Sequence, residues 1–312
     1  MNLRAFKQVD VFTAVPYLGN PLAVVLDGTG LHEADLQRFA HWTNLSETAF
    51  LLPPSAAGAA QGADYRVRIF TPDSELAFAG HPTLGSCHAW LQAGGTPRHQ
   101  DEIVQECPQG LIRIRRDGTR LTFAAPPLQR CAPDTALLAQ VTEALGLQPN
   151  QLLAAQRLDN GPVWLGLWLD SVETVLQLAP NHAALKELGQ KVGVAAMDTA
   201  LPVTPLIARS NREARAVLPR STAWIAPSPD APEMEVRAFL TSTGTDEDPV
   251  TGSLNASLAQ WLIADGLAPS HYVASQGTCL GRTGRVYLSQ DAAGQVWVGG
   301  DAVTCMDGNV CL

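Results

Sequence analysis

One stretch of sequence organises the rest of the chain: Phe-Thr-Pro-Asp-Ser-Glu-Leu-Ala-Phe-Ala-Gly-His-Pro-Thr-Leu-Gly-Ser-Cys-His-Ala-Trp, residues 70–90. It follows a strand-like run, Tyr65 to Phe70, and passes into a helix-like run, Thr83 to Leu91. Because proline is favoured at the first helical position, Pro82 predicts a helix start with His81 as its N-cap. The amides of residues 83 to 85 would then be free. Together with the positive end of the helix dipole, they form a candidate anion site.

The same arrangement occurs a second time, from Glu247 to Leu262. In the first copy Glu75 precedes Gly80 by five residues, and in the second copy Glu247 precedes Gly252 by five, followed by Ser253. Each copy ends in a Trp-Leu pair, and a weaker echo pairs Gly-Asn-Pro-Leu-Ala-Val at 19–24 with Asn-Gly-Pro-Val-Trp-Leu at 160–165. We expect a duplicated unit, although the two echoes have different offsets. The alternative is that glycine with a short polar residue opens many unrelated helices.

Length and charge limit the possible partners. The chain has 312 residues, about twice a typical single domain, with 46% hydrophobic and 16% charged residues. Its formal net charge of −9 argues against nucleic acid or an anionic membrane as the main partner. A local nest of amides can still attract a small anion. We therefore expect a small-molecule anionic substrate, and neither nucleic acid nor membrane as a partner.

Cysteine usage and hydropathy indicate the compartment. The six cysteines form no Cys-x-x-Cys pair, and residues 1–15 lack a continuous apolar signal core. The longest strongly apolar runs, such as Val163 to Leu169, are too short to span a membrane. We expect a soluble cytoplasmic protein with reduced thiols.

Hydrophobic periodicity predicts many strands and few helices. Helices are expected at Leu31–Trp42, Thr83–Leu91, Thr135–Leu145, Ala183–Leu188 and Ser253–Ala264. Pro53–Ala63 reads as a surface loop, Asp117-Gly118 as a hairpin turn, and Ala125–Leu128 as the crossing between two halves. Strands are expected at Ala5–Thr13, Leu22–Leu26, Thr48–Leu52, Tyr65–Phe70, Ile103–Val104, Leu111–Arg115, Leu121–Ala124, Leu152–Leu158, Val163–Trp168, Val203–Ala208, Thr222–Ala226, Glu235–Phe239, Arg285–Ser289, Gln295–Val298 and Ala302–Met306. This pattern favours an α+β class over regular βαβ alternation.

Three residues are candidates for chemistry. Glu47, in Asn-Leu-Ser-Glu-Thr, lies at a loop-to-strand junction beside apolar residues, where a carboxylate can act as a general base and then as an acid. The alternative for Glu47 is a plain surface glutamate. His81 could be an ordinary cap or core histidine, and Asp248 before Pro249 could be a turn former.

Other kinds of site have little support. His81, Cys87 and His88 are close in sequence but lack the spacing of a metal site, so we expect no metal. The glycine-rich run 277–285 lacks the Gly-Lys-Ser/Thr ending of a phosphate loop and precedes a strand. The run 251–255 does not match the Gly-x-Ser-x-Gly pattern of a serine nucleophile.

Taken together and in order, the motifs are far more specific. They are Val9–Thr13, Gly19–Pro21, Asn44–Thr48, Phe70–Pro72, Ala79–Thr83, Glu247–Ser253, Gln276-Gly277 and Gly281–Gly284. Over essentially the whole chain they resemble the phenazine-biosynthesis PhzF-like family, whose fold is similar to that of diaminopimelate epimerase. The resemblance implies an α+β protein of two pseudo-symmetric halves, each a β-barrel-like sheet around a central helix. We expect residues 1–125, completed by the C-terminal strand 300–312, to form the first half and 126–299 the second.

The resemblance also implies roles for individual residues. Glu47 is the implied acid/base, with His81 and Asp248 in the same cleft. Gly80, Gly252 and Ser253 are implied at the helix starts that hold the substrate. The epimerases use two cysteines at these helix starts, where this chain has none, and its nearest thiol, Cys87, falls well inside the first helix. Two-cysteine racemisation is therefore not expected, no cofactor or metal is required, and the resemblance implies a homodimer.

The expected function is a cofactor-independent isomerase that moves a proton on a small cyclic, carboxylate-bearing metabolite, similar to trans-2,3-dihydro-3-hydroxyanthranilate isomerase. The best-known member acts in phenazine biosynthesis, but many relatives have no known substrate, so the physiological substrate stays open. One alternative is a non-catalytic small-molecule binding protein, which would not need Glu47, His81 and Asp248 together. Another is an amino-acid epimerase or racemase, which the missing cysteines weaken.

Overall fold

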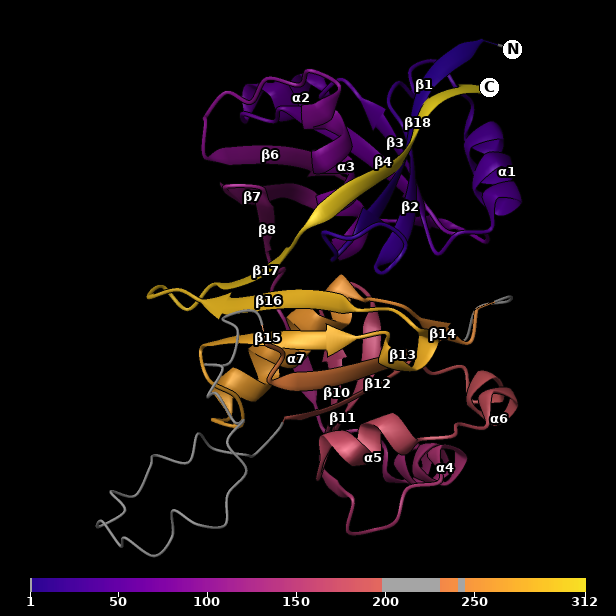
Figure 1. Cartoon of the computed structure of the whole chain (residues 1–312), viewed down its shortest axis with the longest axis vertical. Coiled ribbons are helices and arrows are strands. Elements are labelled where there is room, and N and C mark those ends of the chain that lie inside the picture. Colours follow the sequence, from indigo (N-terminus) through magenta and orange to yellow (C-terminus); the bar gives the residue numbers. More distant parts are fainter. Residues whose placement is uncertain (1, 198–230, 241–244) are drawn as a thin grey trace, which may run out of the picture.

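A computed structural model describes residues 2–197, 231–240 and 245–312. Two halves are stacked along the long axis, with both described chain ends in the upper one (Figure 1). The first half contains β1–β8 and β18, and the second contains β9–β17. The elements of the first half are β1 (Leu3–Val11), β2 (Asn20–Val25), α1 (Glu33–Thr43), β3 (Thr48–Leu52), α2 (Ala56–Ala60), β4 (Tyr65–Phe70), β5 (Glu75–Leu76), α3 (Gly80–Gln92), β6 (Glu102–Cys107), β7 (Gly110–Asp117), β8 (Arg120–Ala124) and β18 (Ala302–Cys311).

Among the described residues, the second half repeats the order of the strands and of the buried helix, and it adds the helix α4 before its first long strand. Its elements are β9 (Gln129–Cys131), α4 (Thr135–Leu145), β10 (Leu152–Asp159), β11 (Val163–Leu169), α5 (Val172–Gln177), α6 (His182–Glu187), β12 (Val192–Met197), β13 (Met234–Phe239), β14 (Glu247–Asp248), α7 (Gly252–Ala264), β15 (His271–Gln276), a 3-10 turn (Thr278–Leu280), β16 (Gly284–Gln290) and β17 (Val296–Gly300).

Strand pairing shows that the halves have one topology. In the first half β1–β2 is antiparallel, β2–β3 parallel, β3–β4 and β4–β5 antiparallel, β4–β6 parallel, and β6–β7–β8 antiparallel. In the second half, β10–β11, β11–β12, β12–β13, β13–β14, β13–β15 and β15–β16–β17 pair in the same senses. The prediction of an α+β fold with two related halves is confirmed.

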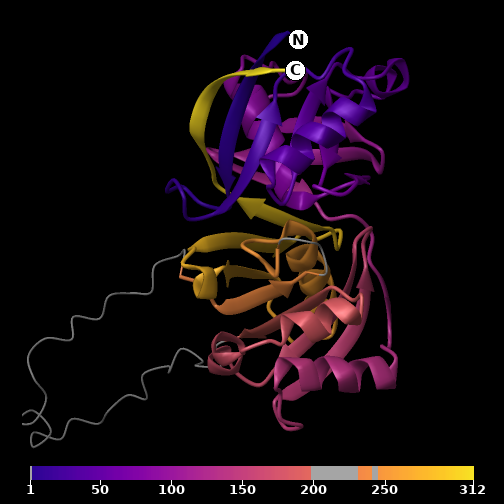
Figure 2. The same ribbon diagram turned by 90° about the vertical axis from the view of Figure 1, so that its right-hand side faces the viewer.

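The halves exchange their last strands. β9 follows β8 in the chain but pairs with β10 of the second half, and β18 follows β17 but pairs with β1 of the first half. In Figure 2 the yellow β18 leaves the lower half and runs beside the indigo β1. Where the two crossings start, β8 and β17 pair antiparallel and join the halves by backbone hydrogen bonds. The boundaries at 125/126 and 299/300 as domain limits stay a prediction.

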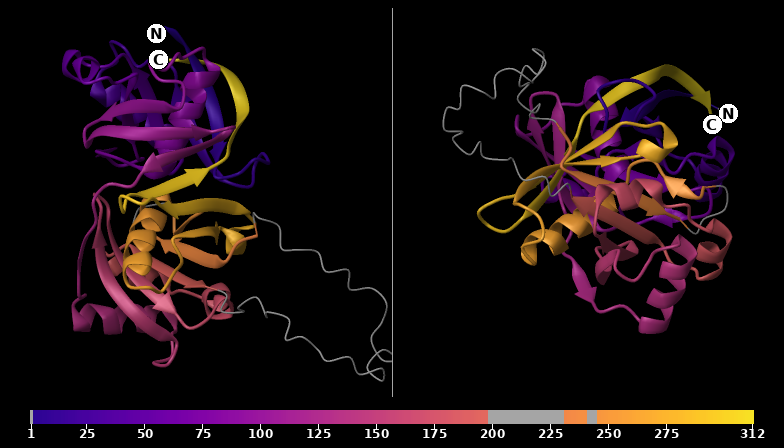
Figure 3. Two further views of the ribbon diagram at one scale, coloured as in Figure 1. Left: turned by 90° about the vertical axis from the view of Figure 1, so that its left-hand side faces the viewer. Right: turned by 60° about the horizontal axis from the view of Figure 1, so that its bottom comes forward.

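Each half wraps its sheet around one buried helix, α3 or α7 (Figure 3). Both helices are buried around most of their circumference, as expected for a helix inside a protein and not on its surface. One apolar core cluster contains residues of both helices and of the strands around them, including Leu84 and Leu254. The helix starts meet: a Cβ added to Gly80 would lie 2.9 Å from Gly252 Cα. Glycine is therefore needed at both positions because the two backbones touch.

The glutamates of the repeated motif also have matching partners. Arg68 on β4 binds Glu75 with two hydrogen bonds of 2.7 and 2.6 Å. Arg237 on β13 binds Glu247 in the same way, at 2.9 and 2.7 Å. Each pair ties the last strand residues before the buried helix to the neighbouring strand. The two motifs are therefore structurally equivalent, as the sequence repeat predicts.

Several local predictions are confirmed. Helix α4 begins after Asp134, whose carboxylate accepts a hydrogen bond from the Leu137 amide (2.8 Å), and it ends at Gly146 in the left-handed conformation. The hairpin at Asp117 joins β7 to β8. The predicted strands at 203–208 and 222–226 lie outside the described residues.

Other local predictions are wrong. Helix α3 begins at Gly80 with Ala79 as its N-cap, so His81 lies inside the helix and Pro82 is its third residue. The amide of Thr83 bonds the Ala79 carbonyl (3.2 Å), so the free amides of α3 belong to Gly80 and His81, not to residues 83–85. The short helix α2 lies in the predicted loop, and β12, α5 and the two-residue strands β5 and β14 were not predicted.

Candidate active site

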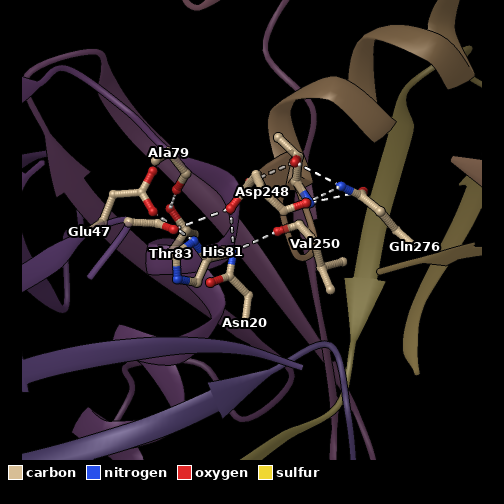
Figure 4. A network of polar contacts seen from close by, with 10 residues as sticks. Asn20, Glu47, Ala79, His81, Thr83, Asp248, Val250 and Gln276 are labelled. Carbon is tan, nitrogen blue, oxygen red and sulfur yellow. Dashed lines mark hydrogen bonds and ion pairs between the residues drawn. The ribbon is translucent and has the colours of Figure 1, made fainter. Parts of the chain in front are cut away.

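Glu47 lies in the turn between α1 and β3. Helix α1 ends at Asn44 in the left-handed conformation, and the chain then enters the buried strand at Thr48. The side chain of Glu47 remains 17% exposed, and its Oε2 lies 3.0 Å from Nδ1 of His81 in an ion-pair contact (Figure 4). The carboxylate is thus held by the buried core on one side and reaches a cavity on the other.

His81 is buried near the start of α3, with its side chain only 3% exposed. Burial disfavours the charged imidazolium, but the Glu47 carboxylate outweighs this effect and Asp248 adds to the attraction. The pKa of His81 is therefore raised above its ordinary value. The two carboxylates around His81 therefore stabilise its imidazolium form relative to an imidazole that is buried without them.

Asp248 approaches the same point from the second half, at the end of β14. Its Oδ1 accepts hydrogen bonds from Asn20 Nδ2 (2.9 Å) and Ser46 Oγ (3.3 Å), and its Oδ2 accepts one from Thr251 Oγ1 (2.6 Å). Burial and the nearby Glu47 raise the pKa of Asp248 to about 6, although these hydrogen bonds oppose the shift. Because Asn20 and Ser46 belong to the first half, Asp248 is held across the boundary.

A second network fixes the start of α7. The Gln276 amide group donates to the Asp248 carbonyl (3.1 Å) and to Thr251 Oγ1 (3.0 Å), while its Oε1 accepts from the Thr251 amide (3.0 Å) and from Asn255 Nδ2 (2.8 Å) (Figure 4). These residues are all buried, so every bond is shielded from water. The position of Asp248 is therefore set by a rigid support.

A cavity of about 530 Å³ lies between the halves. Three of the predicted site residues, Glu47, Asp248 and Ser253, line it. His81 lies behind Glu47, while Gly80 and Gly252 meet at the helix contact without being part of the lining. The remaining lining residues are Ser46, Thr71, Pro72, Asp73, Ser74, Glu75, Leu76, Ala77, Phe78, Ala79, Gln109, Gly161, Pro162, Trp164, Lys191, Leu240, Thr245 and Thr251.

Sequence reasoning missed several residues of this site. Asn20 and Ser46 stood in the quoted motifs without a role, yet both bind Asp248. Trp164 donates from Nε1 to Ser253 Oγ (3.3 Å) and belongs to the weaker echo. Lys191 precedes a strand that was not predicted, so no sequence signal pointed to it.

Cysteine chemistry does not fit the site. Cys87 is fully buried inside α3, and burial raises the pKa of its thiol to about 12. Such a thiol stays protonated and unreactive. This agrees with the absence of cysteine from the two helix starts.

In residues 2–197, 231–240 and 245–312, no group of three or more His, Cys, Asp or Glu side chains is arranged to hold a metal ion. Within those same ranges, no helix is both long and apolar enough to cross a membrane.

Known proteins with similar sequences span the whole chain. Antisense-enhancing sequence 1 of Schizosaccharomyces pombe is 32% identical over 99% of both chains. Trans-2,3-dihydro-3-hydroxyanthranilate isomerase of Pseudomonas aeruginosa is 30% identical, covering 99% of this chain and 100% of its own.

Solved structures show the same fold. The PhzF-family phenazine biosynthesis protein of Bacillus anthracis superposes over 100% of both chains with a TM-score of 0.77 at 21% identity. A hydroxyproline epimerase of Agrobacterium vitis, covering 99% of this chain and 93% of its own, shares the fold at a TM-score of 0.57 and 14% identity. The profile of the phenazine biosynthesis-like proteins matches residues 9–308. The chain therefore belongs to the PhzC-PhzF family of phenazine biosynthesis-like proteins, a family of isomerases.

Proposed function

We propose that the protein is a cofactor-independent isomerase that moves a proton on a small, cyclic, carboxylate-bearing metabolite, with Glu47 as the acid/base. The observation that carries the proposal is the placement of Glu47: its carboxylate reaches the cavity between the halves while touching the buried His81. A carboxylate fixed in this way can take a proton from one carbon and return it to another. The net reaction is a proton shift, so it requires no electron acceptor.

The surroundings of Glu47 suit the charge changes of such a reaction. When a C–H bond beside a carboxylate or a conjugated system is broken, negative charge builds up on the substrate. The free amides at the starts of α3 and α7 and the positive ends of their dipoles favour that charge. His81 and Asp248 act on Glu47, His81 by orienting it and Asp248 by setting the charge balance of the buried cluster.

Asp248 can change its protonation state near neutral pH, because its pKa is raised to about 6. Ionisation of Asp248 adds a negative charge to the buried cluster beside Glu47, so the charge of the cluster depends on pH in this range. Asp248 therefore sets the charge balance of the site.

The decisive experiment measures proton–deuterium exchange from solvent into trans-2,3-dihydro-3-hydroxyanthranilate, the compound in the name of a 30% identical relative. Glu47→Gln keeps the size of the side chain but cannot accept a proton, so exchange should fall by about 10² to 10⁴-fold. His81→Ala and Asp248→Ala should reduce the exchange rate less than Glu47→Gln does, and they should also raise KM. Glu143→Gln, an exposed change on α4, is the matched control and should leave exchange unchanged.

Three outcomes would contradict the proposal. If Glu47→Gln exchanged deuterium as fast as the wild type, the acid/base would be another group. If the wild type bound ring carboxylates but exchanged none across a panel of cyclic acids, the protein would be a binding protein. An amino-acid racemase would be revealed by exchange at the Cα of proline or hydroxyproline that depended on a cysteine.

We also infer a cytoplasmic homodimer. Free thiols at Cys131, Cys279 and Cys311 are exposed, which fits a reducing compartment. An apolar groove of about 640 Å³ lies between α1 and the end of β18, and its lining includes Trp42, which is 79% exposed. Exposed apolar patches of this kind mark association surfaces, and a second copy is the occupant that the family resemblance favours. Light scattering should give a dimer for the wild type and a monomer for Trp42→Asp; a wild-type mass of 33.2 kDa would contradict the inference.

A further inference from the structure

The residue before the third strand of each half occupies an equivalent position. Glu47 precedes β3, and Lys191 precedes β12. Thr48, the first residue of β3, pairs with Ala23 on one side and Phe70 on the other. Val192, the first residue of β12, pairs with Leu165 and Phe239 in the same two senses. Because the first residues of the two strands have equivalent pairing partners, Lys191 is the structural counterpart of Glu47.

Side-chain contacts support this register. Phe70 and Phe239 each end the strand that pairs with the third strand, and each lies under an arginine guanidinium, at 5.1 Å for Arg68 and 5.0 Å for Arg237. Both arginines bind the glutamate of the repeated motif. The residues on the strands that pair with β3 and β12 therefore also correspond. The equivalence of Glu47 and Lys191 thus rests on these side-chain contacts as well as on the backbone pairing.

Lys191 lies on the wall that the second half contributes to the cavity. Its backbone is fixed, because its carbonyl accepts hydrogen bonds from the Leu165 amide (2.9 Å) and from Gln190 Nε2 (3.0 Å). Its Nζ lies 5.8 Å from the ring centroid of Trp164, whose Nε1 donates to Ser253 Oγ. Lys191, Trp164 and Ser253 therefore form one continuous surface that ends at the start of α7.

The charge on Lys191 is available to a ligand. The chain has three lysines, of which Lys7 pairs with Asp307 at 2.5 Å and Lys186 with Asp246 at 2.6 Å. Lys191 has no carboxylate within 4.0 Å among the described residues.

The positive charge of Lys191 differs from the other charges in the lining of the cavity. Among the described residues that line it, the charged side chains are Glu47, Asp73, Glu75, Asp248 and Lys191. The other four are acidic, so among these described residues Lys191 is the side chain that offers a positive charge to an anionic substrate in the cavity. An ammonium group with three donors and no acceptor in the described part of the chain is a suitable partner for a carboxylate.

We propose that Lys191 binds the carboxylate of the substrate beside the start of α7, and thereby makes the enzyme selective for anionic substrates. The inference rests on the proposed function and adds the orientation of the substrate in the cavity. By symmetry alone, either helix start could take the carboxylate. Lys191 assigns it to the second half, which leaves the first half, with Glu47, to the reacting carbon. Lys191 is a specificity-determining residue in this arrangement, and Glu47 remains the acid/base.

Binding measurements with two aromatic probes test the proposal without turnover. The probes are 3-hydroxyanthranilate, which carries a carboxylate, and its neutral carboxamide, titrated by calorimetry into the wild type and variants. Lys191→Met should weaken binding of the carboxylate probe by about ten- to hundredfold and leave binding of the carboxamide unchanged. Lys191→Arg, which keeps the charge, should retain much of the preference for the carboxylate over the carboxamide. Lys186→Met, which removes a lysine outside the cavity, should behave like the wild type.

The outcomes separate this inference from the proposed function. Unchanged carboxylate affinity in Lys191→Met, an equal loss for both probes, or a wild type that does not prefer the carboxylate would each overturn the role of Lys191. Glu47→Gln should still bind the carboxylate probe more tightly than the carboxamide, because Lys191 is unchanged. If it does so but still exchanges deuterium, the acid/base assignment fails while the carboxylate site stands.

Discussion

The contact between the two helix starts can be tested by adding one methyl group. In Gly80→Ala the new Cβ would lie 2.9 Å from Gly252 Cα and 2.8 Å from Cζ of Phe123, whereas ordinary contact begins at 3.4 Å. The backbones must therefore separate by about 0.5 Å, because backbone cannot rotate away as a flexible side chain can. Overpacking of this kind costs about 1–3 kcal/mol of unfolding free energy.

The same separation should reduce activity. It moves Glu47, which the first half carries, away from Asp248 and Lys191, which the second half carries. A misplacement of about 1 Å can cost about 10²-fold in rate, so we expect a loss of about tenfold or more in deuterium exchange. Gly252→Ala should do the same, since its Cβ would lie 2.9 Å from Gly80 Cα. The double variant should lose less than the sum of the two, because one separation relieves both contacts.

Denaturant unfolding gives the stability change, and exchange gives the activity. Gly308→Ala is the matched control, because a Cβ at that position meets nothing within 4 Å. If Gly80→Ala were as stable and as active as Gly308→Ala, the helix starts could not be in contact in solution, and the glycines would need another explanation.

Three further predictions concern charge and the buried thiol. Arg237→Met should lower the free energy of unfolding by about 3–5 kcal/mol, because it leaves a buried carboxylate unpaired. The same change at the more exposed Arg68 should lower it by about 1 kcal/mol or less. Equal losses for the two variants in urea unfolding would contradict this. Asp248 has its pKa raised from 3.8 to about 6, so the folded state binds more protons between these values. The free energy of unfolding should therefore fall by about 3 kcal/mol as pH rises from about 4 to about 6, and Asp248→Asn should remove this dependence, while His81 acts in the same direction at higher pH. Cys87→Ser should leave exchange close to that of the wild type, and a folded but inactive variant would show that a thiol takes part.

The sequence was most informative where local chemistry decides structure. The Glu-x₄-Gly repeats correctly indicate two equivalent buried helices, since each glutamate binds an arginine and each glycine touches the other. The repeats do not keep a constant offset, because the segment between β12 and β13 is longer than the one between β3 and β4. A single spacing therefore cannot describe the duplication.

Other features depend on tertiary contacts and could not be predicted from sequence. The preference of proline for the first helical position placed the start of α3 two residues late, because contact with Gly252 selects Gly80 as the start. Lys191 looks like any surface lysine, and its place in the cavity follows only from the pairing of β12 with β11 and β13. The position of Asp248 could be read from its motif, but two of its three hydrogen-bond donors, Asn20 and Ser46, belong to the first half and lie far away in sequence.

The exchanged strands carry a historical implication. β9 and β18 are related as the swapped arms of a two-fold symmetric dimer, each crossing to the other body. We infer that the chain descends from two identical half-length polypeptides that traded their last strands and were later fused into one gene. In that ancestor the positions now occupied by Glu47 and Lys191 had to hold the same amino acid, because a single gene encoded both. Fusion freed each position to mutate alone, so an acid and a base could come to face one cavity.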